Sequence, residues 1–279
     1  MRDAPIGVFD SGIGGLTVLR ELARELPHER FIYLGDTARL PYGTKSANTV
    51  SRYAVQAAEA LANHGVKAIV IACNTAAAVG IEAIQARLGD LPVSGVIEPG
   101  AQAACEASPS GRIAVIATEA TVRGGAYERA ILRRRPDAVV IQLPAQLLVA
   151  LAEEGLVEGA VAAGVVRHYL GFLFGASPFD PATGGGEPPP DTLVLGCTHF
   201  PLLAATIRAV VGPEVRIVDS AATTAAAVRG QLQAAGIART RGTQSLQFMA
   251  TDGPERFARV GGRFLGRRID PQRIELIDL

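Results

Sequence analysis

Short apolar runs alternate with amphipathic segments along the whole chain. The expected strands cover residues 6–9, 31–34, 68–72, 93–97, 113–116, 138–143, 193–195, 215–218, 246–249 and 273–276. The expected helices cover residues 16–26, 47–64, 76–88, 101–107, 122–134, 147–151, 157–173, 223–235 and 254–265, and Pro201 opens a further one. This alternation is typical of an α/β fold with mostly parallel strands. The sequence Glu98-Pro99-Gly100 is expected to interrupt the chain between two units, because Pro and Gly break regular structure.

One local pattern occurs twice. Residues 68–75 read AIVIACNT, and residues 192–199 read TLVLGCTH. Each is an apolar run, typical of a buried parallel strand, followed by a small residue, a cysteine, two polar residues and a helix-like stretch. A helix N-terminus favours the thiolate form of a cysteine. Cys73 and Cys197, one in each half of a repeated α/β chain, therefore predict one reaction centre approached from both sides.

Composition narrows the class of protein. The 279 residues suffice for one large or two modest α/β domains, and 48% of them are hydrophobic. A net charge of +0 argues against non-specific binding of nucleic acid and against a basic membrane-binding surface. The chain has no apolar run of about 18 residues and no basic start followed by an apolar stretch. Three cysteines without framework spacing fit a reducing compartment, so we expect a cytoplasmic protein.

The turn at residues 10–15 reads DSGIGG and lies between an expected strand and an expected helix. Free N–H groups at such a helix start favour an anion. The spacing is neither G-x-G-x-x-G nor G-K-[ST], and Asp10 would repel phosphate, so the signal for a nucleotide is weak. A small-anion or amino-acid site fits better, and a plain turn capped by Asp10 is the alternative.

The two cysteines have three other possible roles. A buried cysteine at a strand end is often an inert small hydrophobe, but the repetition favours chemistry. Zinc is disfavoured because Cys197 and His199 lack a second close ligand pair. A cysteine hydrolase with His199 as its base would leave the matching Cys73 segment without a role. Cys105 is expected to serve packing and His168 to be an ordinary helix residue, while His28 and His64 are expected to lie on the surface at helix ends.

Six segments resemble the glutamate racemases of the cofactor-independent aspartate/glutamate racemase superfamily. They are GVFDSGIGG at 7–15, YLGDTARLPYG at 33–43, ACNTA at 72–76, GVIEPGA at 95–101, LGCTHFPLL at 195–203 and VDSA at 218–221. The resemblance runs almost from end to end. It implies two pseudo-symmetric α/β domains with mostly parallel sheets and an active site at their interface. The first would contain residues 1–97 plus 207–279, with Asp10 and Cys73, and the second residues 98–206, with Cys197 and His199.

The resemblance also implies a two-base reaction. An amino-acid Cα–H is a very weak acid, and a racemase removes a proton from one face and returns one to the other. Two bases on opposite faces achieve this when one is a thiolate and the other a thiol. By resemblance, Cys73 would abstract the proton from D-glutamate and Cys197 from L-glutamate. No cofactor is implied, in keeping with the two lysines, Lys45 and Lys67, because pyridoxal phosphate needs a Schiff-base lysine.

The supporting roles come from motif positions. Asp10 and His199 would assist the proton transfers of Cys73 and Cys197, and Asp36 and Glu153 would be further catalytic residues. The implied substrate contacts are Asp10, Ser11, Tyr42, Gly43, Asn74, Thr75, Thr198 and His199. Hydroxyls, amides and helix-start N–H groups suit two carboxylates and an ammonium. An ordinary turn at Tyr42-Gly43, and an Asp36 that only caps the next turn, are the alternatives.

The sequence departs from the family pattern in three places, of which Ile116-Ala117-Thr118, in place of the usual Ile-Gly-Thr, is a small change. The usual Cys-Pro before the stretch Val-x-Leu-x-Glu is absent from LPAQ at 143–146, so Glu154 competes with Glu153 for the site role. Residues 175–191, rich in Gly and Pro, are expected to form a flexible surface loop that is longer than usual.

The predicted function is glutamate racemase, supplying D-glutamate for peptidoglycan. Its predicted partners are the small-molecule substrate and a second copy in a homodimer, with no nucleic acid and no membrane. One alternative is a racemase for aspartate or another acidic amino acid, because pocket size decides this specificity and spacing does not reveal it. The other is a non-catalytic anion-binding protein on the same scaffold, which the paired cysteines argue against.

Overall fold

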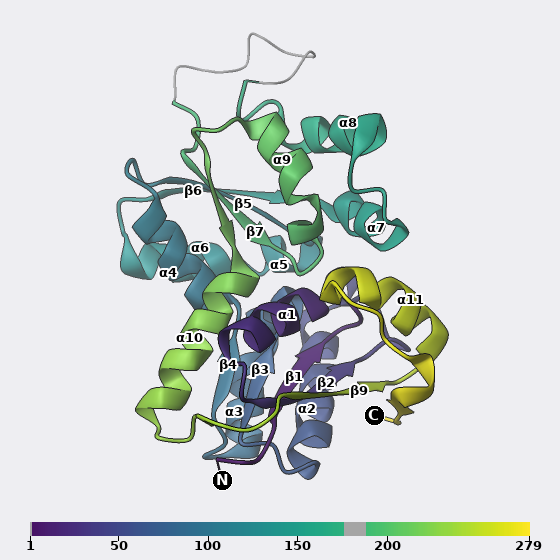
Figure 1. Ribbon diagram of the computed structural model, residues 1–279. Coiled ribbons are helices and arrows are strands. Elements are labelled where there is room, and N and C mark those ends of the chain that lie inside the picture. The colour runs from purple at the N-terminus through teal and green to yellow at the C-terminus, as the bar shows by residue number, and fades with distance from the viewer. Residues whose placement is uncertain (1, 176–187) are drawn as a thin grey trace.

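The computed structural model describes residues 2–175 and 188–279. The molecule has two halves, each built around its own sheet, and one half lies above the other in Figure 1. The first sheet has the order β10-β9-β2-β1-β3-β4 and the second β6-β5-β7-β8. The strands are β1 Ile6–Asp10, β2 Arg30–Gly35, β3 Ala68–Ile71, β4 Val93–Gly95, β5 Arg112–Ala117, β6 Val139–Pro144, β7 Thr192–Gly196, β8 Arg216–Asp219, β9 Ser245–Ala250 and β10 Ile274–Leu276. Every strand pair within the described residues is parallel. The predicted α/β fold class is confirmed.

The two sheets contain the same four-strand unit. The order β2-β1-β3-β4 in the first matches β6-β5-β7-β8 in the second, strand for strand. Cys73 follows β3 and Cys197 follows β7, so the two cysteines occupy equivalent positions. The carboxyl ends of parallel strands lie at one edge of a sheet, where ligands of α/β proteins bind. The predicted pseudo-symmetry is thus visible in the strand order.

Helices cover the sheets and join the two halves. They are α1 Leu16–Glu25, α2 Ala47–Asn63, α3 Asn74–Leu88, α4 Ile97–Ala107, α5 Glu119–Arg123, α6 Ala126–Arg134, α7 Gln146–Glu154, α8 Gly159–Leu170, α9 Ala204–Val211, α10 Ser220–Ala234 and α11 Pro254–Leu265, with 3₁₀ turns at Tyr42–Thr44, Phe200–Leu203 and Pro271–Arg273. In α1, Leu16, Leu19 and Leu22 are buried at helical spacing against the first sheet. Helix α10 packs on both α1 and α4 (Figure 1). Within residues 2–175 and 188–279, no helix is long and apolar enough to cross a membrane.

Two sequence predictions are wrong. Glu98-Pro99-Gly100 does not break the chain, because α4 already begins at Ile97. Pro99 lies in the first turn of this helix, where the missing N–H costs no hydrogen bond. The expected helix 122–134 is two helices, α5 and α6, separated at Gly124-Gly125, and Gly125 has a φ of +60°, which favours glycine.

The predicted domain boundary before residue 207 does not follow the sheets. Strand β8, Arg216–Asp219, pairs with β7 in the second sheet, although residues 207–279 were assigned to the first domain. The pairing of β8 with β7 assigns β8 to the second sheet, and the local sequence of β8 does not reveal this pairing. The chain returns to the first sheet through α10. The division into two domains otherwise remains a prediction, and the loop expected at 175–191 lies largely outside the described residues.

A buried ion pair ties four segments of the first half together. The Lys67 ammonium donates to Glu29 Oε2 at 2.6 Å and to the carbonyls of Arg2 and Ile237, while Glu29 Oε1 accepts the backbone N–H of Arg239. We expect Lys67→Met to lower the free energy of unfolding by about 3–5 kcal/mol, because it leaves the Glu29 carboxylate buried without its partner. Urea unfolding measures this. Lys67→Met combined with Glu29→Gln should recover part of the loss, and an unchanged midpoint for the single variant would contradict the prediction.

Candidate active site

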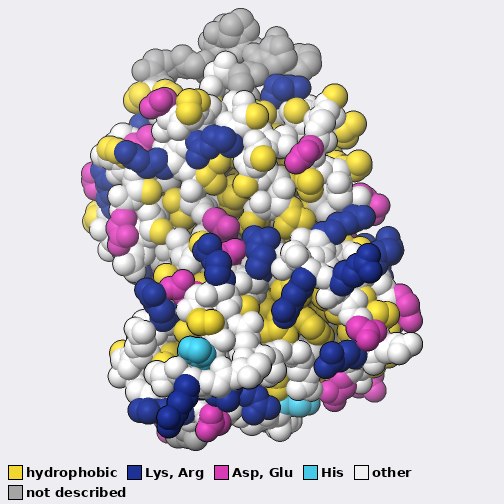
Figure 2. All heavy atoms as spheres, in the orientation of Figure 1, with side chains coloured by type: hydrophobic (Ala, Val, Ile, Leu, Met, Phe, Trp, Pro, Cys, Tyr) yellow, Lys and Arg dark blue, Asp and Glu magenta, His cyan; other side chains and the backbone are white. Residues whose placement is uncertain are grey.

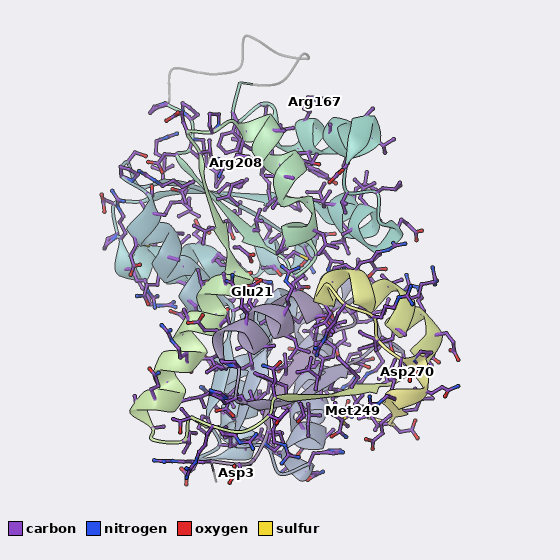
Figure 3. All side chains as sticks on the ribbon, viewed as in Figure 1. Asp3, Glu21, Arg167, Arg208, Met249 and Asp270 are labelled. Carbon is purple, nitrogen blue, oxygen red and sulfur yellow. The ribbon has the colours of Figure 1, made fainter. Side chains whose placement is uncertain are left out.

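The two repeated cysteines open on one cavity of about 40 Å³ between the halves. Side chains from both halves fill the space between the upper and the lower half of the molecule (Figure 3). Ten predicted site residues line this cavity: Ser11, Tyr42, Gly43, Cys73, Asn74, Thr75, Glu153, Cys197, Thr198 and His199. Asp10 and Asp36 are not among its lining residues, and both are buried behind it. The structure therefore brings most of the predicted site together from segments spread over the chain.

Cys73 is the N-cap of α3, at the point where β3 ends. Its Sγ accepts the backbone N–H of Ala76 at 3.5 Å and donates to Ser11 Oγ at 3.4 Å. Burial, followed by the charge of Asp10, raises the pKa of the Cys73 thiol, and the hydrogen bonds with Ser11 and Ala76 offset this only in part. The resulting pKa of about 12 keeps Cys73 a neutral thiol at physiological pH.

Cys197 has a different neighbour. Its Sγ lies 3.7 Å from His199 Nδ1, and His199 Nε2 lies 3.2 Å from Glu153 Oε1. Burial lowers the pKa of His199, but hydrogen bonds to Cys197 and Glu153 outweigh it and raise this pKa to about 10. His199 is thus an imidazolium at neutral pH, and its charge stabilises negative charge on the Cys197 sulfur. The Cys197 sulfur therefore lies beside a positive charge, whereas the Cys73 sulfur lies near the negative charge of Asp10.

Asp10 ends β1 and is almost completely buried. Its Oδ2 accepts the backbone N–H of Gly12 at 2.9 Å, and its Oδ1 has no hydrogen-bond partner among the described residues. Burial raises the pKa of Asp10, and the positive charge of His199 opposes this rise. Asp10 thus lies within electrostatic reach of both Cys73 and His199. Its predicted role in proton handling remains a prediction.

Asp36 supports Tyr42 from behind. The Tyr42 hydroxyl donates to Asp36 Oδ2, Arg39 Nε donates to the same oxygen at 2.7 Å, and Thr251 Oγ1 donates to Oδ1 at 3.0 Å. Burial and the charge of Asp36 raise the pKa of Tyr42. Asp36 is fully buried and occupied by three donors, so it orients Tyr42 rather than facing the cavity. This placement does not support the direct catalytic role predicted for Asp36.

The start of α3 presents polar groups to the cavity. Asn74 Oδ1 accepts the Tyr127 hydroxyl at 2.7 Å, and Asn74 Nδ2 has no partner among the described residues. Thr75 Oγ1 lies 2.9 Å from Thr118 Oγ1, which joins the two halves because Thr118 follows β5. Thr118 and Gln146 line the cavity but were missed in the sequence. The position of Thr118, two residues after the expected strand 113–116, was the available signal.

The competition between Glu153 and Glu154 is decided by geometry. Glu153 lines the cavity, contacts His199 through Oε1 and accepts Arg256 Nη2 on Oε2 at 2.8 Å, whereas Glu154 is exposed. Arg256 on α11 was also missed. Nothing in its local sequence distinguishes it from the neighbouring arginines of that helix.

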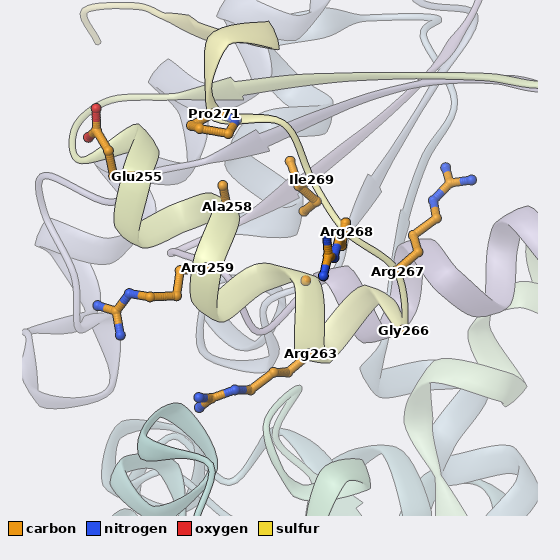
Figure 4. Close-up of a pocket in the computed structure, with 10 residues that line it drawn as sticks. Glu255, Ala258, Arg259, Arg263, Gly266, Arg267, Arg268, Ile269 and Pro271 are labelled. Atoms are coloured by element: carbon orange, nitrogen blue, oxygen red, sulfur yellow. The ribbon is translucent and has the colours of Figure 1, made fainter.

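A larger hollow of about 520 Å³ lies along α11 and the turn after it (Figure 4). Arg259 and Arg263 extend away from Ile269 and Pro271, so their charges do not converge on the hollow (Figure 4). It contains no cysteine, and the smaller cavity between the halves is the better candidate. The described residues contain no group of three or more His, Cys, Asp or Glu side chains able to hold a metal ion.

Comparison with known proteins decides the family. The model of the Asp/Glu/hydantoin racemase family matches residues 6–171, more than half of the chain. The chain belongs to this family. It is similar to the glutamate racemase of Geobacter metallireducens, with 46% identity over 95% of this chain and 93% of that protein. It is also similar to the glutamate racemase of Neisseria meningitidis serogroup A, with 46% identity over 100% and 98% of the two chains.

Solved structures agree with the family. The crystal structure of glutamate racemase from Francisella tularensis in complex with D-glutamate has a TM-score of 0.88 and 34% identity over 100% of this chain and 98% of that chain. The predicted resemblance and the prediction of an amino-acid racemase, an isomerase, are confirmed. A structure of an aspartate racemase homologue from Pyrococcus horikoshii, 15% identical with a TM-score of 0.52, shows only a shared fold.

The protonation of His199 predicts a basic limit to the activity of this family member. We expect kcat/KM for racemisation to fall as the pH rises through about 10, because His199 then loses the charge that balances Cys197. The sign follows from a pKa raised above its usual value of 6.5, which keeps the cation until that higher pH. A pH–rate profile and NMR titration of the imidazole measure the effect. Titration of His199 near pH 6.5 would contradict it.

Proposed function

We propose that this chain is a glutamate racemase that interconverts L- and D-glutamate by two-base proton transfer, with no cofactor. In one direction the Cys197 thiolate removes the Cα proton of L-glutamate and becomes a thiol. The electron pair of the broken C–H bond is delocalised into the α-carboxylate, and the Cys73 thiol delivers its proton to the opposite face. D-glutamate leaves with Cys73 as thiolate, and the reverse reaction starts from that state.

The observation that carries this proposal is the pair of thiols at equivalent strand ends, opening on one cavity in unlike surroundings. Burial and Asp10 keep Cys73 protonated, and His199 stabilises charge on Cys197. The names of the relatives in Geobacter and Neisseria, and the D-glutamate bound in the Francisella enzyme, support glutamate as the substrate.

The lining residues suit a dicarboxylate with an ammonium. The free amide of Asn74 and the N–H groups at the start of α3 are donors for a carboxylate. Asp10, which is buried behind the cavity, places negative charge near the site and so favours the ammonium. Ser11, Tyr42, Gly43, Thr75 and Thr198 supply the remaining contacts in this proposal. Asp36 acts through Tyr42 as a positioning residue.

The cavity is smaller than its substrate. Its volume of about 40 Å³ holds about three water molecules. Glutamate needs more space than this, so we propose that the two halves move apart to admit it and close again around it. Such closure excludes water from the reacting groups and strengthens the electrostatic interactions within the site. We further propose that the enzyme acts in the cytoplasm as a homodimer and supplies D-glutamate for peptidoglycan.

An assay with purified protein and no added cofactor tests the substrate. L-Glutamate and L-aspartate are followed separately by circular dichroism, in H₂O and in D₂O. We expect glutamate to racemise with uptake of deuterium at Cα and aspartate to react at least about 100-fold more slowly, since a missing methylene alters how both carboxylates are held. Faster turnover of aspartate would establish the sister specificity. Inactivity on every acidic amino acid, with binding retained, would support a non-catalytic protein.

A further inference from the structure

Glu153 is held from both sides by charged groups that belong to different halves of the molecule. It lies on α7 of the second half, and its Oε1 meets His199 Nε2 at 3.2 Å. Its other oxygen, Oε2, accepts Arg256 Nη2 at 2.8 Å, and Arg256 lies on α11, which packs on α1 in the first half. The resulting chain of contacts runs from Arg256 through Glu153 and His199 to Cys197.

A second arginine seats α11 against the same end of α7. Arg263 Nη1 lies 3.4 Å from the backbone oxygen of Glu153. A Cβ on Gly155 would lie 2.4 Å from that guanidinium, so glycine at this position lets Arg263 approach. Cations are stabilised at a helix C-terminus, where the last carbonyls are unpaired. Basic side chains gather over α11 on this face, whereas α7 itself contains none (Figure 2).

We propose that Arg256 is a positioning residue that locks Glu153 onto His199 when the two halves are closed, and thereby couples closure to proton transfer at Cys197. The proposal rests on the proposed function. Opening the cavity separates α11 from α7 and removes Arg256 from Glu153. The carboxylate then has one partner and is free to turn toward water. Closure restores both partners and fixes the imidazolium beside the sulfur.

The charges around Glu153 support this coupling. His199 and Arg256 face its carboxylate directly, Arg263 contacts its backbone, and Asp10 is a more distant negative charge. The hydrogen bond from His199 lowers the pKa of Glu153, burial opposes it, and Arg256 lowers this pKa further. Loss of Arg256 therefore makes Glu153 easier to protonate, which removes the negative charge that holds His199 in its cationic form.

The test compares Arg256→Gln with Arg259→Gln. Arg259 is exposed on the same helix and extends from the same side as Arg263 (Figure 4), so it controls for loss of one positive charge. We expect Arg256→Gln to lower kcat/KM about tenfold, the loss of one charge-assisted contact in the transition state, and to move the acidic limb of the pH profile to higher pH. Arg259→Gln should change neither.

Isotope effects locate the affected step. The two enantiomers are equal in energy, so any variant changes kcat/KM equally in both directions and the ratio carries no information. When proton transfer at Cys197 becomes slower, the deuterium effect on kcat/KM rises for 2-deuterated L-glutamate and falls for 2-deuterated D-glutamate. We expect this divergence in Arg256→Gln and a partial return in Arg256→Lys, which keeps the charge but loses the planar fork.

The outcomes separate the two proposals. A wild-type enzyme that does not racemise glutamate overturns the proposed function itself. A wild-type enzyme that does so, with both isotope effects and the acidic limb unchanged in Arg256→Gln, overturns only the role of Arg256. A fall in kcat/KM with equal isotope effects for both enantiomers also overturns it, because a general structural defect does not select one sulfur. Thermal unfolding checks that the variants are folded.

Discussion

Cys73→Ala will lose racemisation but will still exchange the Cα hydrogen of L-glutamate with D₂O. In this variant Cys197 can remove the proton from its own face, trade it for deuterium and return deuterium to the same face. The product is deuterated L-glutamate with its configuration retained. Cys197→Ala will show the mirror result, with exchange confined to D-glutamate. NMR of the Cα hydrogen and chiral chromatography measure exchange and inversion separately.

We expect the loss of racemisation to reach about 10³-fold or more, because each variant removes one of two obligatory proton carriers. Cys105→Ala is the matched control. Cys105 is partly buried beside the Ile131 carbonyl and does not line the cavity, so its removal should leave the activity intact. If Cys73→Ala still racemises glutamate, the two-thiol mechanism is wrong. If one variant exchanges the Cα hydrogen of both enantiomers, the cysteine that remains in it can reach both faces of Cα, and the two cysteines do not act on separate faces.

The unlike surroundings of the two sulfurs also predict which enantiomer of glutamate the resting enzyme can deprotonate. Cys73 is a thiol with a pKa near 12, and the His199 cation balances charge on Cys197. In the proposed mechanism, this state removes a proton from L-glutamate at Cys197 and donates one from Cys73 to the opposite face. After one turnover the charges are reversed, with the negative sulfur now near Asp10. We expect Asp10, whose own pKa is raised by burial, to take up a proton from solvent and so offset that repulsion.

Local patterns in the sequence predict most elements of the fold. Strand-length apolar runs and helical periodicity are properties of residues close together in the sequence, and the structure confirms most elements predicted from them. Strand pairing depends on residues far apart in the sequence, so the place of β8 in the second sheet was not predictable from its own residues. Pro99 was misinterpreted for a related reason. Proline breaks a helix interior but is accepted in a first turn, and only the true start at Ile97 distinguishes the two cases.

The site was predicted where a motif carries it and missed where only the fold does. Cys73 and Cys197 repeat one pattern, and His199 lies two residues from the second sulfur. Arg256 reaches Glu153 across 103 residues of sequence, and its helix holds other arginines of similar setting. The placement of Asp36 behind Tyr42 likewise depends on Arg39 and Thr251, which occupy its oxygens from separate segments.

Gly14→Ala should disturb the Cys197 segment although it adds only one methyl group. A Cβ at Gly14 would lie 2.3 Å from Thr198 Oγ1 and 2.5 Å from His199 Nδ1, distances that real contacts do not reach. Neither neighbour can easily move. Both are buried, and the backbone oxygen of Thr198 accepts the Thr17 hydroxyl at 2.9 Å. The added methyl group must therefore push the Cys197 segment away from the turn after β1.

We expect Gly14→Ala to lower kcat/KM by about 100-fold, since a displacement of about 1 Å in a catalytic group costs that much. Gly164→Ala is the control, because no atom lies within 4 Å of a Cβ at that position in α8. It should keep full activity and raise the free energy of unfolding by about 0.5–1 kcal/mol, as alanine favours a helix over glycine. Steady-state kinetics and urea unfolding of both variants measure this. If Gly14→Ala keeps normal activity, Gly14 does not lie as close to Thr198 and His199 during turnover as it does in this structure. Closure around the substrate would then depend on a different contact between the two halves.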